Sequence, residues 1–178
     1  MKFVIASDIH GSEYYCKKLV ERIIEEKCDR ILILGDILYH GPRNDLPKEY
    51  SPKGVIALLE KFGDKILAVR GNCDTEVDQM VLSFPILAEY AAVCVGEKLL
   101  YLTHGHNIPD SIKQGGNIIL SGHTHVPVSV EEDDYTQLNP GSVSIPKENS
   151  PHSYMTFENG TFLWKDVETG EIYKEYKI

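Results

Sequence analysis

Seven residues of types that commonly bind metals occur in five short motifs, each just past an apolar run that favours a β-strand. They are Asp8 and His10 in Ser-Asp-Ile-His-Gly, Asp36 in Gly-Asp, Asn72 in Arg-Gly-Asn-Cys-Asp, His104 in His-Gly-His, and His123 and His125 in Gly-His-Thr-His. Burying a carboxylate or an imidazole is costly unless another group compensates it. A pair of divalent cations would compensate several of them together, so the sequence predicts a dinuclear metal site.

The motifs of Asp8, Asp36 and Asn72 have ordinary explanations when each is taken alone. Asp8 could cap the helix that follows it, with His10 at the surface, and Asn72 could be a turn residue beside a glycine. In an extended segment, however, Asp8 and His10 lie on the same face because strand periodicity is two. The two side chains would then share one cation.

The Gly35-Asp36 pair suits a position between two cations. Two dications about 3.5 Å apart repel each other by roughly 19 kcal/mol if the effective dielectric constant is about 20. Such a pair needs a shared anion, and Asp36 is the candidate. An Asp at this position could also cap a helix or organise a turn.

The two His-x-His motifs give the stronger signal. Imidazole is a common metal ligand, and alternating positions after a strand again present both rings on one side. Four of the seven histidines fall in these motifs, namely His104, His106, His123 and His125. A single histidine is usually a core or surface residue whose ring has hydrogen-bond partners. Four histidines at two strand ends instead favour a metal site.

The elements that must position these motifs alternate in the first half of the chain. Strands are predicted at Lys2–Ser7, Arg30–Leu34 and Lys65–Val69, and helices at Tyr14–Lys27 and Pro52–Phe62. The first helix has apolar residues at helical spacing, and continuous apolar runs are typical of strands buried on both faces. This order predicts a parallel sheet with right-handed crossovers.

The second half has the pattern of mostly antiparallel β-structure. Hairpins are predicted at 86–103 and 126–138, and a further buried strand at Asn117–Ser121. The tail alternates apolar and polar residues, with turns at 158–160 and 168–170. We therefore expect an α/β protein in which residues 1–178 form a single domain.

Composition restricts the class of protein. The apolar fraction is 42% and the charged fraction 25%, as in soluble globular proteins. The apolar opening of the chain is too short for a signal peptide or a membrane span, so we expect a cytoplasmic protein without a membrane partner. The four cysteines are scattered, in agreement with a reducing compartment. A net charge of −9 argues against a nucleic-acid polymer as partner.

Together and in this order, the motifs D-x-H, G-D, G-N-x-[HDE], H-G-H and G-H-T-H resemble those of the calcineurin-like metallophosphoesterase superfamily. The resemblance runs from Asp8 to about Pro146. Within the superfamily the chain is similar to the small YfcE-type phosphodiesterases of bacteria and archaea. That similarity is carried by Gly-Asp-Ile-Leu-Tyr-His-Gly-Pro-Arg-Asn at 35–44, Arg-Gly-Asn-Cys-Asp at 70–74 and Asn-Pro-Gly-Ser-Val-Ser-Ile-Pro at 139–146.

The resemblance implies a four-layer α/β/β/α sandwich with the dinuclear metal site at the carboxyl ends of the strands. One metal would be held by Asp8, His10, Asp36 and His125, and the second by Asp36, Asn72, His104 and His123. The family generally prefers Mn²⁺ in such a ligand set. Fe, Zn, Co and Ni are alternatives that the ligand types alone do not separate.

One position departs from many members of the superfamily. Cys73 stands where a histidine commonly contacts the phosphate and assists the leaving group. A neutral thiol is a poor general acid compared with imidazole, although the YfcE-type members share this cysteine. We expect Asp36, Asn72 and Cys73 in the catalytic site, with His106 or His40 as alternative proton donors.

The implied activity is hydrolysis of phosphodiester bonds by a hydroxide that bridges two divalent cations. Two dications, two carboxylates and one hydroxide leave a net charge of about +1, which suits a monoanionic diester. Arg43, Asn44 and His40, in the loop 38–51, are the candidates for substrate binding. The expected partner is a small phosphodiester, and the apolar β-hairpin tail leaves a homo-oligomer open.

Two other functions stay as alternatives. A phosphomonoesterase that acts on a small phosphorylated metabolite or a phosphoprotein would use the same metals, and faster turnover of monoesters would identify it. A non-catalytic protein-binding scaffold of the same fold has a precedent in a retromer subunit, whose ligand positions look degraded in part. All seven ligand positions are present in this chain, which favours an enzyme.

Overall fold

The structure is a computed structural model that describes residues 1–178. The first half of the chain contains β1 (Lys2–Ala6), α1 (Glu13–Glu26), β2 (Arg30–Ile33), α2 (Pro52–Leu59), the 3₁₀ helix η1 (Glu60–Lys65), β3 (Ile66–Ala68) and the short helix α3 (Glu76–Gln79). The second half contains β4 (Tyr90–Val95), β5 (Lys98–Thr103), the 3₁₀ turn η2 (Asp110–Ile112), β6 (Asn117–Leu120), β7 (Pro127–Glu131), β8 (Tyr135–Pro140), β9 (Ser153–Glu158), β10 (Thr161–Asp166) and β11 (Ile172–Lys177).

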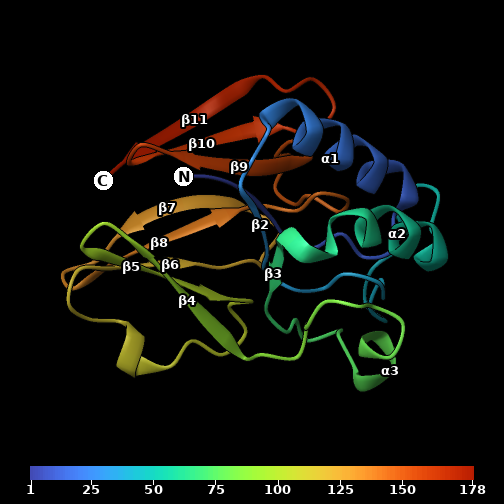
Figure 1. The fold of residues 1–178 in the computed structure, drawn as a ribbon, viewed down its shortest axis with the longest axis horizontal. Helices are drawn as coiled ribbons and strands as arrows, with labels where there is room; N and C mark the ends of the chain where they lie inside the picture. The colour runs from blue at the N-terminus through green and yellow to red at the C-terminus, as the bar shows by residue number, and fades with distance from the viewer.

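The strands form two sheets, as Figure 1 shows. The first sheet has the order β11-β10-β9-β1-β2-β3. Its strands β1, β2 and β3 are parallel, which confirms the parallel sheet expected from the alternation of strands and helices. The C-terminal strands β9, β10 and β11 extend this sheet in antiparallel fashion beyond β1.

The second sheet has the order β4-β5-β6-β8-β7. The hairpins β4–β5 and β7–β8 are antiparallel, as expected. The expectation of mostly antiparallel structure in this half is confirmed by these hairpins and by β9, β10 and β11. The centre of the second sheet departs from it, because β5, β6 and β8 are parallel. The cause is topological, since β5 and β6 are joined by a crossover rather than by a hairpin. Both therefore end at the same edge.

Two apolar layers hold the molecule together. In β1, Val4 faces a cluster of 21 buried residues that includes apolar residues of α1 and α2. The next residue, Ile5, faces a cluster of 14 buried residues between the two sheets, where Trp164 of the first sheet and Leu120 of the second also lie. The alternation explains why the central strands read as continuous apolar runs: both of their faces are buried.

The helices are unevenly distributed over the two sheets. α1 starts after Ser12, whose Oγ accepts the N–H of Tyr15, and α2 starts with Pro52 at its first turn. Both lie beside the first sheet in Figure 1. The connection from β5 to β6 contains one helical turn, η2, so the outermost layer over the second sheet is thin. None of the helices combines the length and the apolar character that crossing a bilayer requires.

Candidate metal centre

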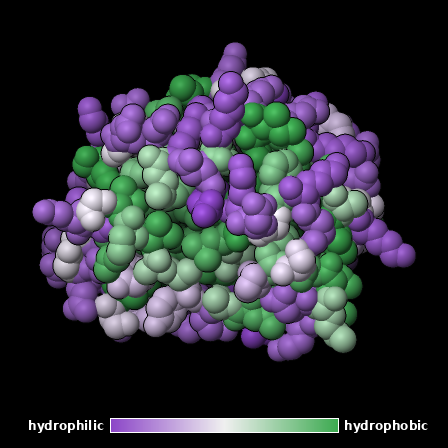
Figure 2. Space-filling view, viewed as in Figure 1, coloured by the Kyte–Doolittle hydropathy of each residue, from purple (hydrophilic) through white to green (hydrophobic).

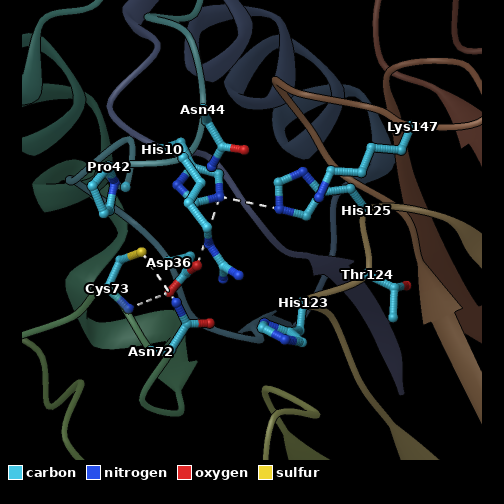
Figure 3. Close-up of a pocket in the computed structure, with 12 residues that line it drawn as sticks. His10, Asp36, Pro42, Asn44, Asn72, Cys73, His123, Thr124, His125 and Lys147 are labelled. Atoms are coloured by element: carbon cyan, nitrogen blue, oxygen red, sulfur yellow. Dashed lines mark hydrogen bonds and ion pairs between the residues drawn. The ribbon is translucent and has the colours of Figure 1, made fainter.

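All five motifs lie at one edge of the two sheets, directly after the strands that precede them in the sequence. β1, β2 and β3 lead to Asp8, Asp36 and Asn72, while β5 and β6 lead to His104 and the His123–His125 segment. There they surround a cavity of about 420 Å³ (Figure 3). Its lining residues are His10, Asp36, Gly41, Pro42, Arg43, Asn44, Asn72, Cys73, His123, Thr124, His125 and Lys147. Asp8 and His104 are fully buried beside it.

The backbone at these motifs is left-handed rather than extended. Positive φ angles occur at Asp8 (58°), His10 (48°), Asp36 (56°), His123 (69°) and His125 (62°). Non-glycine residues adopt this region rarely, and clusters of such residues are typical of functional sites. The expectation that strand alternation aligns Asp8 with His10 is therefore wrong, since each side chain is aimed by a sharp turn just after its strand.

Hydrogen bonds from distant segments hold these turns. The backbone N–H of Asp8 donates to Gly35 O at 3.2 Å, and that of His10 donates to Asp36 O at 2.9 Å. The hydroxyl of Ser142 donates to the carbonyl oxygen of Asp8 at 2.8 Å. The loop after β1 is thus fastened both to the loop after β2 and to the Asn-Pro-Gly-Ser segment.

The first group of candidate ligands consists of Asp8, His10 and His125. Asp8 Oδ1 lies 3.2 Å from His125 Nε2 and 3.6 Å from His10 Nε2. The two Nε2 atoms are 3.3 Å apart. These three side chains could hold one metal ion together.

The second group is arranged around Asp36. Its Oδ2 atom lies 3.6 Å from His10 Nε2 and 3.4 Å from His104 Nε2. His104 Nε2 is also 3.0 Å from Asn72 Oδ1. One carboxylate oxygen therefore faces both groups, which is the position that a ligand shared between two cations must take.

The tautomers of three histidines follow from their backbone contacts. The Nδ1 atoms of His10, His104 and His125 lie 2.7, 2.6 and 2.6 Å from the carbonyl oxygens of Tyr39, Leu34 and Ile145, respectively. A carbonyl oxygen only accepts hydrogen bonds, so each Nδ1 carries the proton. In the neutral ring, the lone pair of each Nε2 then faces the site, as in histidines that bind metals.

The donor atoms fit a pair of cations. Asp8 Oδ1 is buried and has no hydrogen-bond partner, and an orphaned carboxylate oxygen is costly. Lone pairs of His10 Nε2 and His125 Nε2 oppose each other at 3.3 Å. Positive charge among these atoms would satisfy all of them, and the set of oxygen and nitrogen donors suits first-row divalent metals.

The electrostatics of the metal-free protein agree with this interpretation. Burial opposes ionisation of Asp8, but the imidazoles of His10 and His125 outweigh it and hold the pKa of Asp8 below its usual value. Burial likewise opposes protonation of His104, but Asp36 outweighs it and raises the pKa of His104 to about 9. Without metals, protons on the imidazoles would take the place of the cations.

Asp74 is a buried carboxylate that sequence reasoning did not single out as functional. Its Oδ2 atom accepts the N–H of Asp36 at 2.8 Å and that of Gly71 at 2.7 Å, and its Oδ1 atom accepts the N–H of Ile37 at 2.9 Å. The signal was present in the sequence as the last residue of Arg-Gly-Asn-Cys-Asp. Asp74 joins the loops that carry Asp36 and Asn72.

Two glycines allow these loops to approach each other. A Cβ atom on Gly71 would clash with Asp36 Oδ1 and with the backbone nitrogen of Asp36. A Cβ atom on Gly122 would clash with Ser7 Oγ. Gly71 before Asn72 and Gly122 before His123 are therefore required for close approach.

The candidate substrate-binding residues lie in different environments. Arg43 and Asn44 line the cavity, and Asn44 Nδ2 donates to the carbonyl oxygen of His40 at 2.7 Å. The ring of His40 does not line the cavity. It packs edge-on between Tyr39 and Tyr50, with ring centroids 4.8 and 5.1 Å away.

The candidate proton donors also lie in different places. His106 is exposed outside the cavity, and its ring centroid lies 5.5 Å from that of His104 and 6.1 Å from that of His123. Cys73 lines the cavity, where its N–H donates to Asp36 Oδ1 at 2.8 Å. Burial and the nearby charge of Asp36 raise the pKa of the Cys73 thiol to about 12, so the thiol is neutral at pH 7.

Lys147 and Thr124 line the cavity although sequence reasoning missed both. Figure 3 shows the side chain of Lys147 beside the ring of His125. The N–H of Lys147 donates to the carbonyl oxygen of His125 at 3.2 Å. The available signal was the position of Lys147 directly after the Asn-Pro-Gly-Ser-Val-Ser-Ile-Pro segment.

Comparison with known proteins places this geometry in a family. The family model of the calcineurin-like phosphoesterase superfamily domain matches residues 1–161. Phosphodiesterase YfcE of Escherichia coli strain K12 is 44% identical over 164 residues, which cover 89% of this chain and 88% of the relative. Phosphodiesterase MJ0936 of Methanocaldococcus jannaschii is 26% identical over 151 residues, or 79% of this chain and 83% of the relative.

Solved structures agree with these relatives. The structure of the E. coli phosphoesterase YfcE matches with a TM-score of 0.94 and 40% identity, covering 100% of both chains. Vps29 from Entamoeba histolytica, solved in complex with Zn²⁺, matches with a TM-score of 0.65 and 18% identity over 99% of both chains, which shows a shared fold alone. Together with the family match and the two-sheet α/β architecture, these similarities show that the chain belongs to the calcineurin-like phosphoesterase superfamily.

Proposed function

We propose that this protein is a metal-dependent phosphodiesterase that hydrolyses a small phosphodiester. The observation that carries the proposal is the position of Asp36 Oδ2, within 3.6 Å of His10 Nε2 and 3.4 Å of His104 Nε2. One anionic oxygen between two groups of donors suits a dinuclear centre. The names of the relatives from E. coli and M. jannaschii, both phosphodiesterases, support the same activity.

In this proposal the seven side chains of the five motifs hold two divalent cations. Asp8, His10 and His125 would hold one, His104, Asn72 and His123 would hold the other, and Asp36 would be the carboxylate available to both. When bound, such a pair of cations lowers the pKa of a coordinated water and binds the non-bridging oxygens of a phosphoryl group. Mn²⁺ is the metal we propose, on the basis of the general preference of the phosphoesterase superfamily, because the mixed oxygen and nitrogen donors suit several divalent metals equally.

The rest of the cavity supplies groups that bind and orient the phosphate. Arg43 and Asn44 offer N–H donors from the loop after β2, and Lys147 offers an ammonium group from the wall that carries His125. A guanidinium can donate two parallel hydrogen bonds to phosphate oxygens. The neutral thiol of Cys73 lies where it can contact the substrate without adding charge.

A phosphomonoesterase is the second candidate, and one observation favours it. Arg43 and Lys147 add two positive charges to the cavity, and these would attract a dianionic monoester as well as a monoanionic diester. Comparison of the two substrate types therefore decides between the candidates.

The remaining features of the proposal concern the whole protein. We propose that residues 1–178 act as one domain, because an apolar cluster of 14 residues joins the two sheets. We propose the cytoplasm as its compartment, on the basis of four free cysteines. Association of several copies is compatible with the apolar residues exposed on the last strand, Ile172 and Tyr173.

A substrate panel with the Asp36→Asn variant tests the proposal. Wild-type protein loaded with Mn²⁺ should hydrolyse bis-4-nitrophenyl phosphate faster than 4-nitrophenyl phosphate, and a chelator should abolish both activities. The variant removes the shared anion, so kcat should fall by at least about 100-fold. Its metal content, measured by elemental analysis, should fall below the two ions per chain of the wild type.

The matched control is Asp45→Asn in the same loop, since Asp45 is exposed and does not line the cavity. Its activity and metal content should equal those of the wild type. Near-normal activity of Asp36→Asn would contradict the shared-ligand arrangement. Faster turnover of the monoester would reverse the order of the two candidates, and a protein that holds no metal after loading would favour a non-catalytic scaffold.

A further inference from the structure

A second cavity adjoins the metal centre, with Cys73 as the common wall. It has a volume of about 300 Å³, and seven of its ten lining residues are apolar. Cys73 lines both this cavity and the metal cavity. A ligand with its phosphate at the metal centre could therefore extend past Cys73 without leaving the protein surface.

The walls of the second cavity are built on the elements that position the metal ligands. Leu38 and Tyr39 lie in the loop that carries Asp36, and the carbonyl oxygen of Tyr39 is 2.7 Å from His10 Nδ1. Ile56 on α2 forms another wall. Since the same loop bears a candidate ligand and an apolar wall, the distance between the two cavities is set by the fold.

The third wall is α3 together with the turn that follows it, and both expose apolar side chains at the cavity. Val77 is 68% exposed and Val81 is 50% exposed, and both line the cavity. In Figure 2 apolar side chains gather at the lower right, over α3. Exposed apolar residues grouped at a cavity are typical of binding sites rather than of ordinary surface.

The charges of the second cavity disfavour an anionic occupant. Asp78 is its only charged lining residue, and its Oδ2 atom accepts the N–H and the hydroxyl of Thr75 at 2.7 and 2.9 Å. No lysine, arginine or histidine lines this cavity, whereas Arg43 and Lys147 line the metal cavity. A neutral group suits the second cavity, and an anionic group suits the first.

We propose that the second cavity binds an apolar, ring-containing ester group of the phosphodiester while the phosphate lies at the metal centre. The proposal rests on the proposed function and narrows its substrate class to diesters with an aromatic or bulky apolar group. The exposed face of the Tyr39 ring and the methyl groups of Val77 and Val81 supply the contact. Such contacts discriminate between substrates by their apolar size.

Binding of non-hydrolysable phosphonates tests this proposal independently of turnover. Methylphosphonate, phenylphosphonate and 4-biphenylphosphonate share a head group and differ in the apolar group. We expect isothermal titration calorimetry on the Mn²⁺-loaded protein to show at least about tenfold tighter binding of 4-biphenylphosphonate than of methylphosphonate, the size expected for an apolar pocket contact.

The variant Val77→Asn/Val81→Asn should lose this preference and keep its affinity for methylphosphonate. At least half of each side chain is exposed, so the fold does not depend on their burial. Met80→Asn is the matched control, because Met80 belongs to the same turn, is 83% exposed and does not line the cavity. The control should keep the wild-type preference.

The outcomes separate this proposal from the proposed function. If none of the three phosphonates bound to the metal-loaded protein, the result would contradict both the apolar subsite and the proposed function. Equal binding of the three phosphonates to the wild type, or a preference that survives in the double variant, would contradict the apolar subsite alone. A double variant that changes the oligomeric state in size-exclusion chromatography, with the preference unchanged, would assign Val77 and Val81 to a contact between copies and would also overturn the subsite.

Discussion

Asp74 Oδ2 accepts the backbone N–H of Asp36 at 2.8 Å, although 38 positions separate the two residues. The same oxygen accepts the N–H of Gly71 at 2.7 Å, and the other carboxylate oxygen accepts that of Ile37 at 2.9 Å. Asp36 adopts a left-handed conformation, with φ at 56°. A buried anion with no role as a candidate ligand thus holds the turn that aims the central carboxylate at the metal centre.

The variant Asp74→Asn is expected to lose both stability and activity. An amide keeps one acceptor oxygen but turns an NH₂ group toward backbone N–H donors, so buried donors lose their partner. Each unsatisfied group costs about 1–3 kcal/mol in the free energy of unfolding, and kcat should fall because Asp36 is no longer held. Urea unfolding and kinetics on the Mn²⁺-loaded protein measure the two effects.

Asp64→Asn is the control for Asp74→Asn, since Asp64 is exposed on η1 and does not line the metal cavity. It should leave the free energy of unfolding and kcat unchanged. If Asp74→Asn retained wild-type stability, the three hydrogen bonds to its carboxylate would not be what holds the turn.

The stability of the metal-free protein should fall as the pH rises from about 6.5 to about 9. Asp36 raises the pKa of His104 from 6.5 to about 9 against the effect of burial. A raised pKa in the folded state stabilises the fold fully below the unfolded value and loses that contribution as pH passes the folded value. Urea unfolding in the presence of a chelator, at pH 6 and at pH 9.5, measures the loss.

The His104→Gln variant provides the comparison for the pH dependence. It lacks the titrating ring, so its metal-free form should lose less stability across the same window. The metal affinity of the wild type should rise over the same pH window in which its metal-free stability falls. The reason is that cations bind the neutral imidazole and release its proton. Equal loss of stability in the variant and the wild type would assign the pH dependence to other groups.

Lys147→Gln should raise KM for a diester and leave kcat nearly unchanged. Lys147 lines the metal cavity but is exposed, and an exposed charge contributes about 1 kcal/mol or less, which corresponds to at most about fivefold. The effect should shrink in 0.5 M salt because ions screen exposed charges. Lys61→Gln, at an exposed position outside the cavity, is the control. A change confined to kcat would instead give Lys147 a role in the chemical step.

Cys73→Ser should keep activity within a few-fold of the wild type. Burial and the charge of Asp36 raise the pKa of the Cys73 thiol to about 12, so a thiolate nucleophile is absent at pH 7. In the metal-free protein, iodoacetamide should modify the exposed Cys94 and react slowly with Cys73, as mass spectrometry of peptides would detect. A loss of activity beyond about 100-fold would show that the thiol takes part in the reaction.

Much of the fold could be predicted because the relevant signals are local. The apolar runs that predict strands at 2–7, 30–34, 65–69 and 117–121 all correspond to strands of the structure. Burial on both faces requires such runs, whatever the neighbours are. The order of the polar motifs after the strands likewise indicated where these side chains would gather.

The parts that sequence reasoning missed depend on partners far along the chain. The crossover that makes β5 and β6 parallel, the role of Asp74 and the position of Lys147 are set by which segments lie side by side. The four-residue α3 was missed as well, since its capping box at Thr75 is a weak signal before so short a helix.

By itself, the sequence determined which side chains could bind metals and which edge of the sheets they would share, because residue type and strand pattern are properties of short segments. Only the tertiary structure decided how those side chains are aimed. Asp8 and Asp36 stand in left-handed turns, and their conformation is held by hydrogen bonds from segments distant in sequence, including those of Ser142 and Asp74. Such turns are unfavourable for an isolated chain, so the convergence of the donors exists only once the two sheets have packed.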